Sequence, residues 1–164
     1  HLYICAVQGH SDQVKIDDEA AMTKLQLGCR WPVVCAHGTS ADSVQAILRS
    51  GLIPGGPQRS RRHSRRSRTH IHFVPSIDRA RGRIPGLRHG SNVLIRVSMQ
   101  AAMRDGIEFF CATNNVILTR GNSEGVLPPK YFIDITSLDG RHTVVWRQGH
   151  DISMARTSEV ASVA

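Results

Sequence analysis

The sequence is poor in aromatic residues and has no long apolar run. Aromatic residues make up 5% of the 164 positions, which argues against a platform on which successive nucleic-acid bases stack. No stretch of about 18 apolar residues occurs, so we expect no membrane span, and the first residues show no signal-peptide pattern. Because 40% of the residues are hydrophobic, the chain can still bury a core. We expect an intracellular, cytoplasmic protein.

The chain also lacks the spacings of common metal, disulfide and catalytic sites. Its four cysteines form no C-x-x-C pair, which favours reduced, buried thiols over a zinc site or a disulfide framework. None of the nine histidines is paired at the helical spacing of zinc ligands. No Ser-His-Asp order and no pair of catalytic carboxylates stands out. We predict no metal site.

Positive charge is concentrated in one short segment. The net charge is +8, and six arginines within ten residues supply most of it. They stand at positions 59, 61, 62, 65, 66 and 68. Such a run is either a solvated loop or a site for phosphates and nucleic acid.

Short strands outnumber helices in the predicted secondary structure. We expect strands at residues 2–7, 33–36, 69–74, 93–97, 109–112, 116–119, 131–135 and 143–146, and a tight turn at 113–115. We expect helices at residues 17–27, from Ser40 or Thr39 as N-cap to Gly51, and from Met99 to Arg104 behind Ser98 as N-cap. This pattern predicts an α+β domain.

Polar side chains gather at the ends of three of these strands, in residues 8–11, 37–39 and 68–72. Gly38 would let a flat ligand approach the backbone closely. Strand alternation places His70 and His72 on one side. Two imidazoles on one face could bind a metal, or one ring packs against the protein while the other contacts a polar ligand. We predict a cleft for a dinucleotide-type ligand, in which arginine grips phosphate.

Six short motifs follow one another in an order that resembles the C-terminal lobe of the tRNA/RNA 2′-phosphotransferase family. They are Ala6-Val7-Gln8-Gly9-His10-Ser11, His37-Gly38-Thr39, Arg68-Thr69-His70-Ile71-His72, Asp105-Gly106-Ile107, Asn114-Asn115-Val116-Ile117-Leu118-Thr119 and Pro128-Pro129-Lys130-Tyr131-Phe132. The resemblance covers about residues 2–135. It implies an ADP-ribosyltransferase-like split β-sheet with a few short helices, which we expect to form one domain over residues 1–148. Residues 149–164 are mostly small and polar, and we expect them to form a flexible tail.

The resemblance implies an NAD-dependent transferase that acts on RNA. In that family the RNA 2′-phosphate attacks the nicotinamide ribose of NAD⁺ and expels nicotinamide. A second step releases the RNA 2′-hydroxyl and ADP-ribose cyclic phosphate. Such chemistry depends on positioning and charge stabilisation more than on a strong base.

The family's roles carry over to residues of this chain as expectations. His37 and Arg68 would be catalytic, and Arg65, Arg66 and Arg68 would contact the RNA and its 2′-phosphate. The NAD-binding set would be Gln8, Gly9, His10, Ser11, His37, Gly38, Thr39, His70, His72 and Val116. Val116 would stand where many ADP-ribosyltransferases have a catalytic glutamate.

Three departures from the family pattern leave a second interpretation open. Cys5 stands where the family usually has an arginine, and no N-terminal lobe precedes residue 1 in this sequence. Asn115 also replaces a common glycine. We therefore expect one of two kinds of protein. The first is an impaired or retargeted transferase that works with an N-terminal lobe or a larger parent protein. The second is an inactive or non-catalytic binding or structural module within a larger polyprotein or assembly, such as a viral or processed one.

Overall fold

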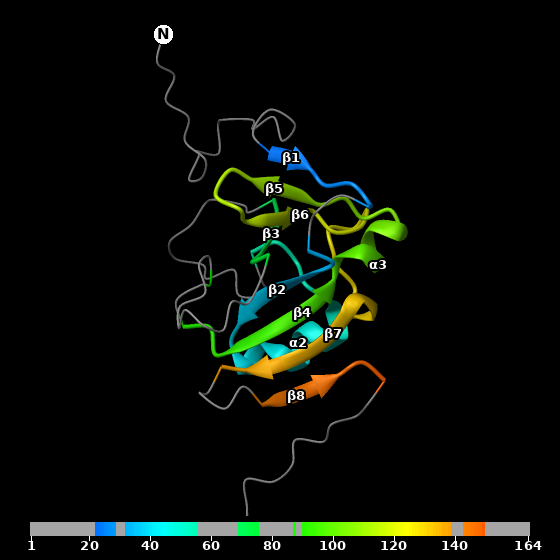
Figure 1. The fold of residues 1–164 in the computed structure, drawn as a ribbon. Helices are drawn as coiled ribbons and strands as arrows, with labels where there is room; N and C mark the ends of the chain where they lie inside the picture. The colour runs from blue at the N-terminus through cyan, green and yellow to red at the C-terminus, as the bar shows by residue number, and fades with distance from the viewer. Residues whose placement is uncertain are drawn as a thin grey trace, which may run out of the picture.

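Two four-stranded antiparallel sheets form the body of the protein (Figure 1). The computed structural model describes residues 22–28, 32–55, 69–75, 87, 90–138 and 143–149. The first sheet has the order β1 (Met22–Lys24), β5 (Phe110–Ala112), β6 (Ile117–Thr119), β3 (Ile71–Phe73). The second has the order β2 (Val34–Thr39), β4 (Val93–Ser98), β7 (Phe132–Ser137), β8 (Val144–Arg147).

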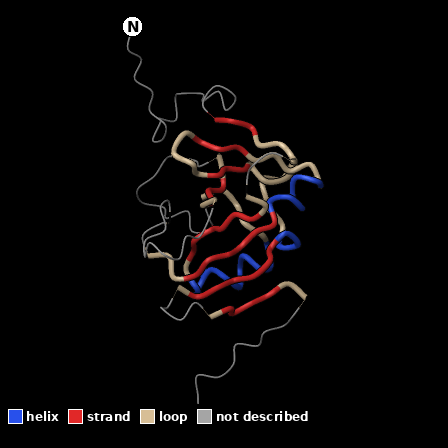
Figure 2. The backbone as a smooth tube through the Cα atoms, in the orientation of Figure 1, coloured by secondary structure: helices blue, strands red, loops and turns tan. Residues whose placement is uncertain are grey.

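Few helices accompany the sheets, as Figure 2 shows. Helix α2 (Ala41–Ser50) lies along one face of the second sheet and packs Ile47 into the core. Helix α3 (Met99–Arg104) follows β4 directly, and a short 3₁₀ turn, η2 (Pro129–Tyr131), precedes β7. The predicted α+β class is confirmed.

One hydrophobic core joins the sheets and the helices. The first sheet contributes residues such as Phe73 and Ile117, and the second contributes residues such as Ile95 and Ile135. The two sheets touch directly at an isolated bridge, where the backbone groups of Ala36 and Val74 exchange hydrogen bonds of 3.0 and 2.9 Å. Beyond this bridge β2 and β3 diverge, and the sheet is split there.

The ends of α2 differ in how well the sequence predicts them. Gly51 ends the helix as expected, with φ of +82° and its N–H donating to the Ile47 carbonyl at 2.8 Å. Ser40 does stand at the N-cap, but its side chain makes no capping bond and contacts the Ser43 hydroxyl instead. The first helical N–H, that of Ala41, donates to Asn92 Oδ1 at 2.7 Å. The acceptor at the N-terminal end of α2 therefore comes from the residue just before β4.

Two other local predictions are confirmed and one is wrong. Ser98 caps α3 by accepting from the Ala101 N–H at 3.3 Å, and Asn115 adopts a left-handed φ of 61° in the turn between β5 and β6. The helix expected at residues 17–27 is wrong where the structure describes it, because residues 22–24 form β1 paired with β5. The predicted strand at residues 2–7 and most of the predicted tail lie outside the described residues.

Candidate functional site

His37 ties the two sheets together at the point where they split. Its Nδ1 lies 2.8 Å from the backbone carbonyl of His72, and its half-buried ring packs edge-on against Phe73 at 5.7 Å between centroids. Because a carbonyl can only accept, Nδ1 carries a proton, and Nε2 is the acceptor nitrogen when the ring is neutral. The predicted motifs around residues 37 and 72 therefore meet in space.

Gly38 presents backbone groups at the open edge of β2. In a strand, the N–H and C=O groups of residues i and i+2 point to the same side. Those of Ala36 point toward β3, where they bond Val74, so those of Gly38 point into the split. A planar group with a donor and an acceptor could pair there as another strand would.

The face of Gly38 is closely covered. A Cβ at this position would collide with Leu87 Cδ1 and would lie 3.0 Å from Ser91 Oγ. That hydroxyl is buried and has no hydrogen-bond partner within the part of the chain that the structure describes. A side chain at residue 38 would therefore have to displace the Leu87 side chain, and glycine avoids this.

A charged pair lies on the same face of the second sheet as Ala36. Arg96 pairs across the ladder with both Ala36 and Asp134, and its Nε donates to Asp134 Oδ1 at 2.7 Å while Nη2 donates to Oδ2. Asp134 is 1% exposed. The bond to Asp134 raises the pKa of Arg96 above its ordinary value, and the two hydrogen bonds satisfy the buried carboxylate.

The outer face of the first sheet, opposite the core, carries the two other predicted histidines. The register pairs Phe110 with Leu118 and Leu118 with His72 across the three strands. When this register is continued by two residues along each strand, Arg120 lies between Glu108 and His70. His70 packs edge-on against Phe110 at 6.5 Å. The prediction that His70 and His72 share one side is therefore confirmed.

Val116 and Thr39 are held by neighbours other than His37. Val116 packs onto the apolar part of the outer face, formed by Phe110, Ala112 and Leu118. The Thr39 carbonyl accepts from the N–H of Asn92 at 3.0 Å, beside the start of α2. The remaining predicted site residues, Gln8, Gly9, His10, Ser11, Arg65, Arg66 and Arg68, lie outside the described residues.

Sequence reasoning missed two residues that hold this region in place. Asn92 bonds both Thr39 and Ala41. Arg120 is exposed, and its Nε lies 3.3 Å from His70 Nε2, while Thr69 Oγ1 lies 2.8 Å from His70 Nδ1. The strand alternation from Val116 through Leu118 could have placed Arg120 on the outer face, whereas no local signal pointed to Asn92.

Other chemistries find little support in the described part of the chain. No group of three or more His, Cys, Asp or Glu residues there lies close enough to bind a metal ion. Cys35 and Cys111 are buried free thiols, and burial raises the pKa of both above that of an exposed thiol. They are poor nucleophiles at neutral pH. No described helix is both long enough and apolar enough to cross a bilayer.

The family model and the relatives that match this chain all point to one family. Residues 1–121 match the model of the RNA 2′-phosphotransferase, Tpt1 / KptA family. The tRNA 2′-phosphotransferase 1 of Bos taurus is 40% identical over 135 residues, covering 82% of this chain and 48% of the relative. The probable RNA 2′-phosphotransferase of Pseudomonas fluorescens is 36% identical over 117 residues, covering 71% and 53%.

A fungal relative extends the same pattern. The tRNA 2′-phosphotransferase of Saccharomyces cerevisiae is 31% identical over 118 residues, covering 71% of this chain and 47% of the relative. The chain thus spans about half the length of the curated relatives it matches. The family model covers well over half of the chain, and it contains the His37 and His72 motifs that meet at the split between the sheets. The chain belongs to the RNA 2′-phosphotransferase, Tpt1 / KptA family.

Proposed function

We propose that this chain carries the NAD⁺-dependent part of an RNA 2′-phosphotransferase. The observation that carries the proposal is the contact between His37 Nδ1 and the His72 carbonyl, at 2.8 Å. It joins two motifs that are far apart in the sequence at the mouth of the split between the sheets. Family membership supplies the reaction class, the transfer of an RNA 2′-phosphate, and NAD⁺ would be the acceptor.

The residues at the split fit NAD⁺. The carboxamide of nicotinamide is planar and has one donor and one acceptor side, which matches the edge N–H and C=O of Gly38. When bound, NAD⁺ would supply an electrophilic ribose carbon with nicotinamide as its leaving group. His37 would accept a hydrogen bond from a ribose hydroxyl at Nε2, because its Nδ1 proton is committed to the His72 carbonyl.

The remaining roles belong to the same proposal. Arg68 would bind the migrating phosphate, with Arg65 and Arg66 on the RNA, since arginine pairs with phosphate through two parallel hydrogen bonds. Gln8, Gly9, His10 and Ser11 would complete the NAD⁺ site with Thr39, His70, His72 and Val116. An RNA substrate and the free thiols of Cys35 and Cys111 favour an intracellular location.

The test is nicotinamide release from NAD⁺, measured with RNA that carries one internal 2′-phosphate. We expect release to depend on this phosphate, so that the same RNA with a 2′-hydroxyl gives none. Arg68→Ala should lower the rate at least about tenfold, whereas Arg49→Ala, which removes an exposed arginine from α2, should leave it unchanged. Release that ignores the 2′-phosphate, or no release at all, would refute the proposal.

A further inference from the structure

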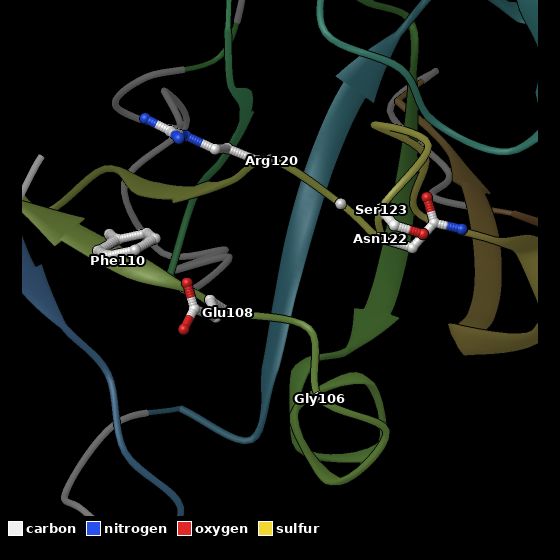
Figure 3. Close-up of a pocket in the computed structure, with 7 residues that line it drawn as sticks. Gly106, Glu108, Phe110, Arg120, Asn122 and Ser123 are labelled. Carbon is white, nitrogen blue, oxygen red and sulfur yellow. The ribbon is translucent and has the colours of Figure 1, made fainter.

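The outer face of the first sheet extends past the two histidines to an open pocket. The pocket has a volume of about 300 Å³, at the lower end of the range for ligand sites. It is lined by Gly106, Glu108, Phe110, Arg120, Gly121, Asn122 and Ser123. Figure 3 shows Arg120, Phe110 and Glu108 on one side, and Asn122 and Ser123, from the loop after β6, on the other.

Arg120 brings a positive charge whose position is fixed. Its Nε donates to His70 Nε2, and the opposite nitrogen of that ring lies 2.8 Å from Thr69 Oγ1. An imidazole nitrogen that accepts from a guanidinium carries no proton, so His70 is neutral in this arrangement. It therefore orients Arg120 without repelling it.

The rest of the pocket is rigid and nearly balanced in charge. Asn122 Oδ1 accepts from the N–H groups of Glu124 and Val126, both at 3.0 Å, and Thr119 Oγ1 accepts from the Gly121 N–H at 3.0 Å. The loop that carries Arg120 and Ser123 is thus held in one shape before any ligand arrives. Glu108 forms an ion pair with Lys24, which offsets its carboxylate, and Arg120 is the cationic residue among those that line the pocket.

The lining groups match one nucleotide better than a base alone. Phe110 is 6% exposed, so the pocket has no broad aromatic face for stacking. An arginine suits a phosphate, and the carboxylate, amide and hydroxyl of Glu108, Asn122 and Ser123 suit ribose hydroxyls, which proteins use to recognise RNA.

We propose that this pocket is a subsite for one nucleotide of the RNA strand, with Arg120 pairing to a backbone phosphate. Two strand residues separate Arg120 from Leu118 and His70 from His72, a rise of about 7 Å. An RNA strand whose 2′-phosphate reaches the NAD⁺ site beside His72 would therefore continue over the same face to Arg120. This inference rests on the proposed function, because RNA is the proposed substrate of that site.

Binding without turnover tests this subsite. A fluorescent single-stranded RNA of about ten nucleotides with one internal 2′-phosphate is titrated in the absence of NAD⁺, at salt concentrations from about 50 to 200 mM. Arg120→Ala should weaken binding about tenfold and reduce the salt slope by about 0.7, the value for one phosphate contact on a single strand. Arg120→Lys should keep the slope, because the charge remains, and Arg49→Ala should match the unaltered chain.

A second titration distinguishes an RNA phosphate from the pyrophosphate of NAD⁺ as the group that Arg120 binds. NAD⁺ affinity, measured by calorimetry, should be the same for Arg120→Ala and the unaltered chain. A loss of NAD⁺ affinity with unchanged RNA binding would overturn the inference and assign the pocket to the dinucleotide. Unchanged binding of both ligands, or no RNA binding by the unaltered chain, would overturn it as well. Because no turnover is needed, failure of the nicotinamide-release assay leaves this comparison decisive.

Discussion

The two ring nitrogens of His37 have different roles, and substitutions can separate them. Nδ1 bonds the His72 carbonyl, whereas Nε2 is proposed to serve the ribose. His37→Asn keeps a donor near the Nδ1 position and loses the distal nitrogen. We expect its free energy of unfolding to lie within about 0.5 kcal/mol of that of the unaltered chain. Its kcat/KM should be about 100-fold lower.

His37→Ala should lose both functions. Removing the donor leaves the His72 carbonyl without this bond, so the free energy of unfolding should fall by about 1 kcal/mol, together with the same loss of kcat/KM. Urea unfolding and nicotinamide release measure the two effects, and Gln45→Ala on the exposed side of α2 is the control. If His37→Asn is as active as the unaltered chain, Nε2 has no role.

Some positions of single residues could be predicted from the sequence, and others could not. Alternation placed His70 and His72 on one side, because a strand imposes its period of two on any sequence. It did not place His37 against His72, since that contact depends on how two separate sheets diverge. Asn92 was missed for a similar reason, because its partner Ala41 lies in another element.

Among the elements, the start of α2 carries the clearest prediction. Asn92 Oδ1 accepts from the Ala41 N–H and its own N–H bonds the Thr39 carbonyl, so it fixes the segment that follows His37 and Gly38. Asn92→Ala should cost about 1 kcal/mol of stability, as the loss of a helix cap does. It should also raise KM for NAD⁺ more than it lowers kcat, because Asn92 positions the segment that is proposed to bind NAD⁺ and is not itself proposed to contact the reacting atoms.

The conservative variant distinguishes capping from packing. Asn92→Asp keeps the acceptor oxygen and adds a negative charge at the helix N-terminus, which the helix dipole favours. We expect thermal unfolding and KM close to those of the unaltered chain. Equal damage from Asn92→Asp and Asn92→Ala would contradict the assigned hydrogen bond.

Elements with strong local signals were predicted well, and those defined by distant partners were not. The apolar run of residues 93–97 and the cap at Ser98 identify β4 and α3, because both signals are local. Residues 22–24 carry no such signal and become a strand by pairing with β5.

Across the whole molecule, a surface cluster links α3 to the segment before β7. Both the Lys130 ammonium and the Tyr131 hydroxyl donate to Asp105 Oδ2 at 2.7 Å, and Lys130 also lies 4.8 Å from the centre of the Tyr131 ring. The hydrogen bond from Lys130, followed by that from Tyr131, holds the pKa of Asp105 below its ordinary value of 3.8. The cluster therefore favours the folded state while Asp105 is ionised.

The sign of the pH dependence follows from that lowered pKa. Below about pH 4 the unfolded chain takes up a proton at residue 105 before the folded chain does, so stability falls with decreasing pH until the folded carboxylate is also protonated. Asp105→Asn removes this difference, and we expect a shallower loss of stability between about pH 4 and pH 2, measured by urea unfolding at each pH. Glu124→Gln, at an exposed carboxylate on the loop after β6, should keep the slope of the unaltered chain. Identical slopes for Asp105→Asn and the unaltered chain would show that the cluster does not stabilise the fold through this carboxylate.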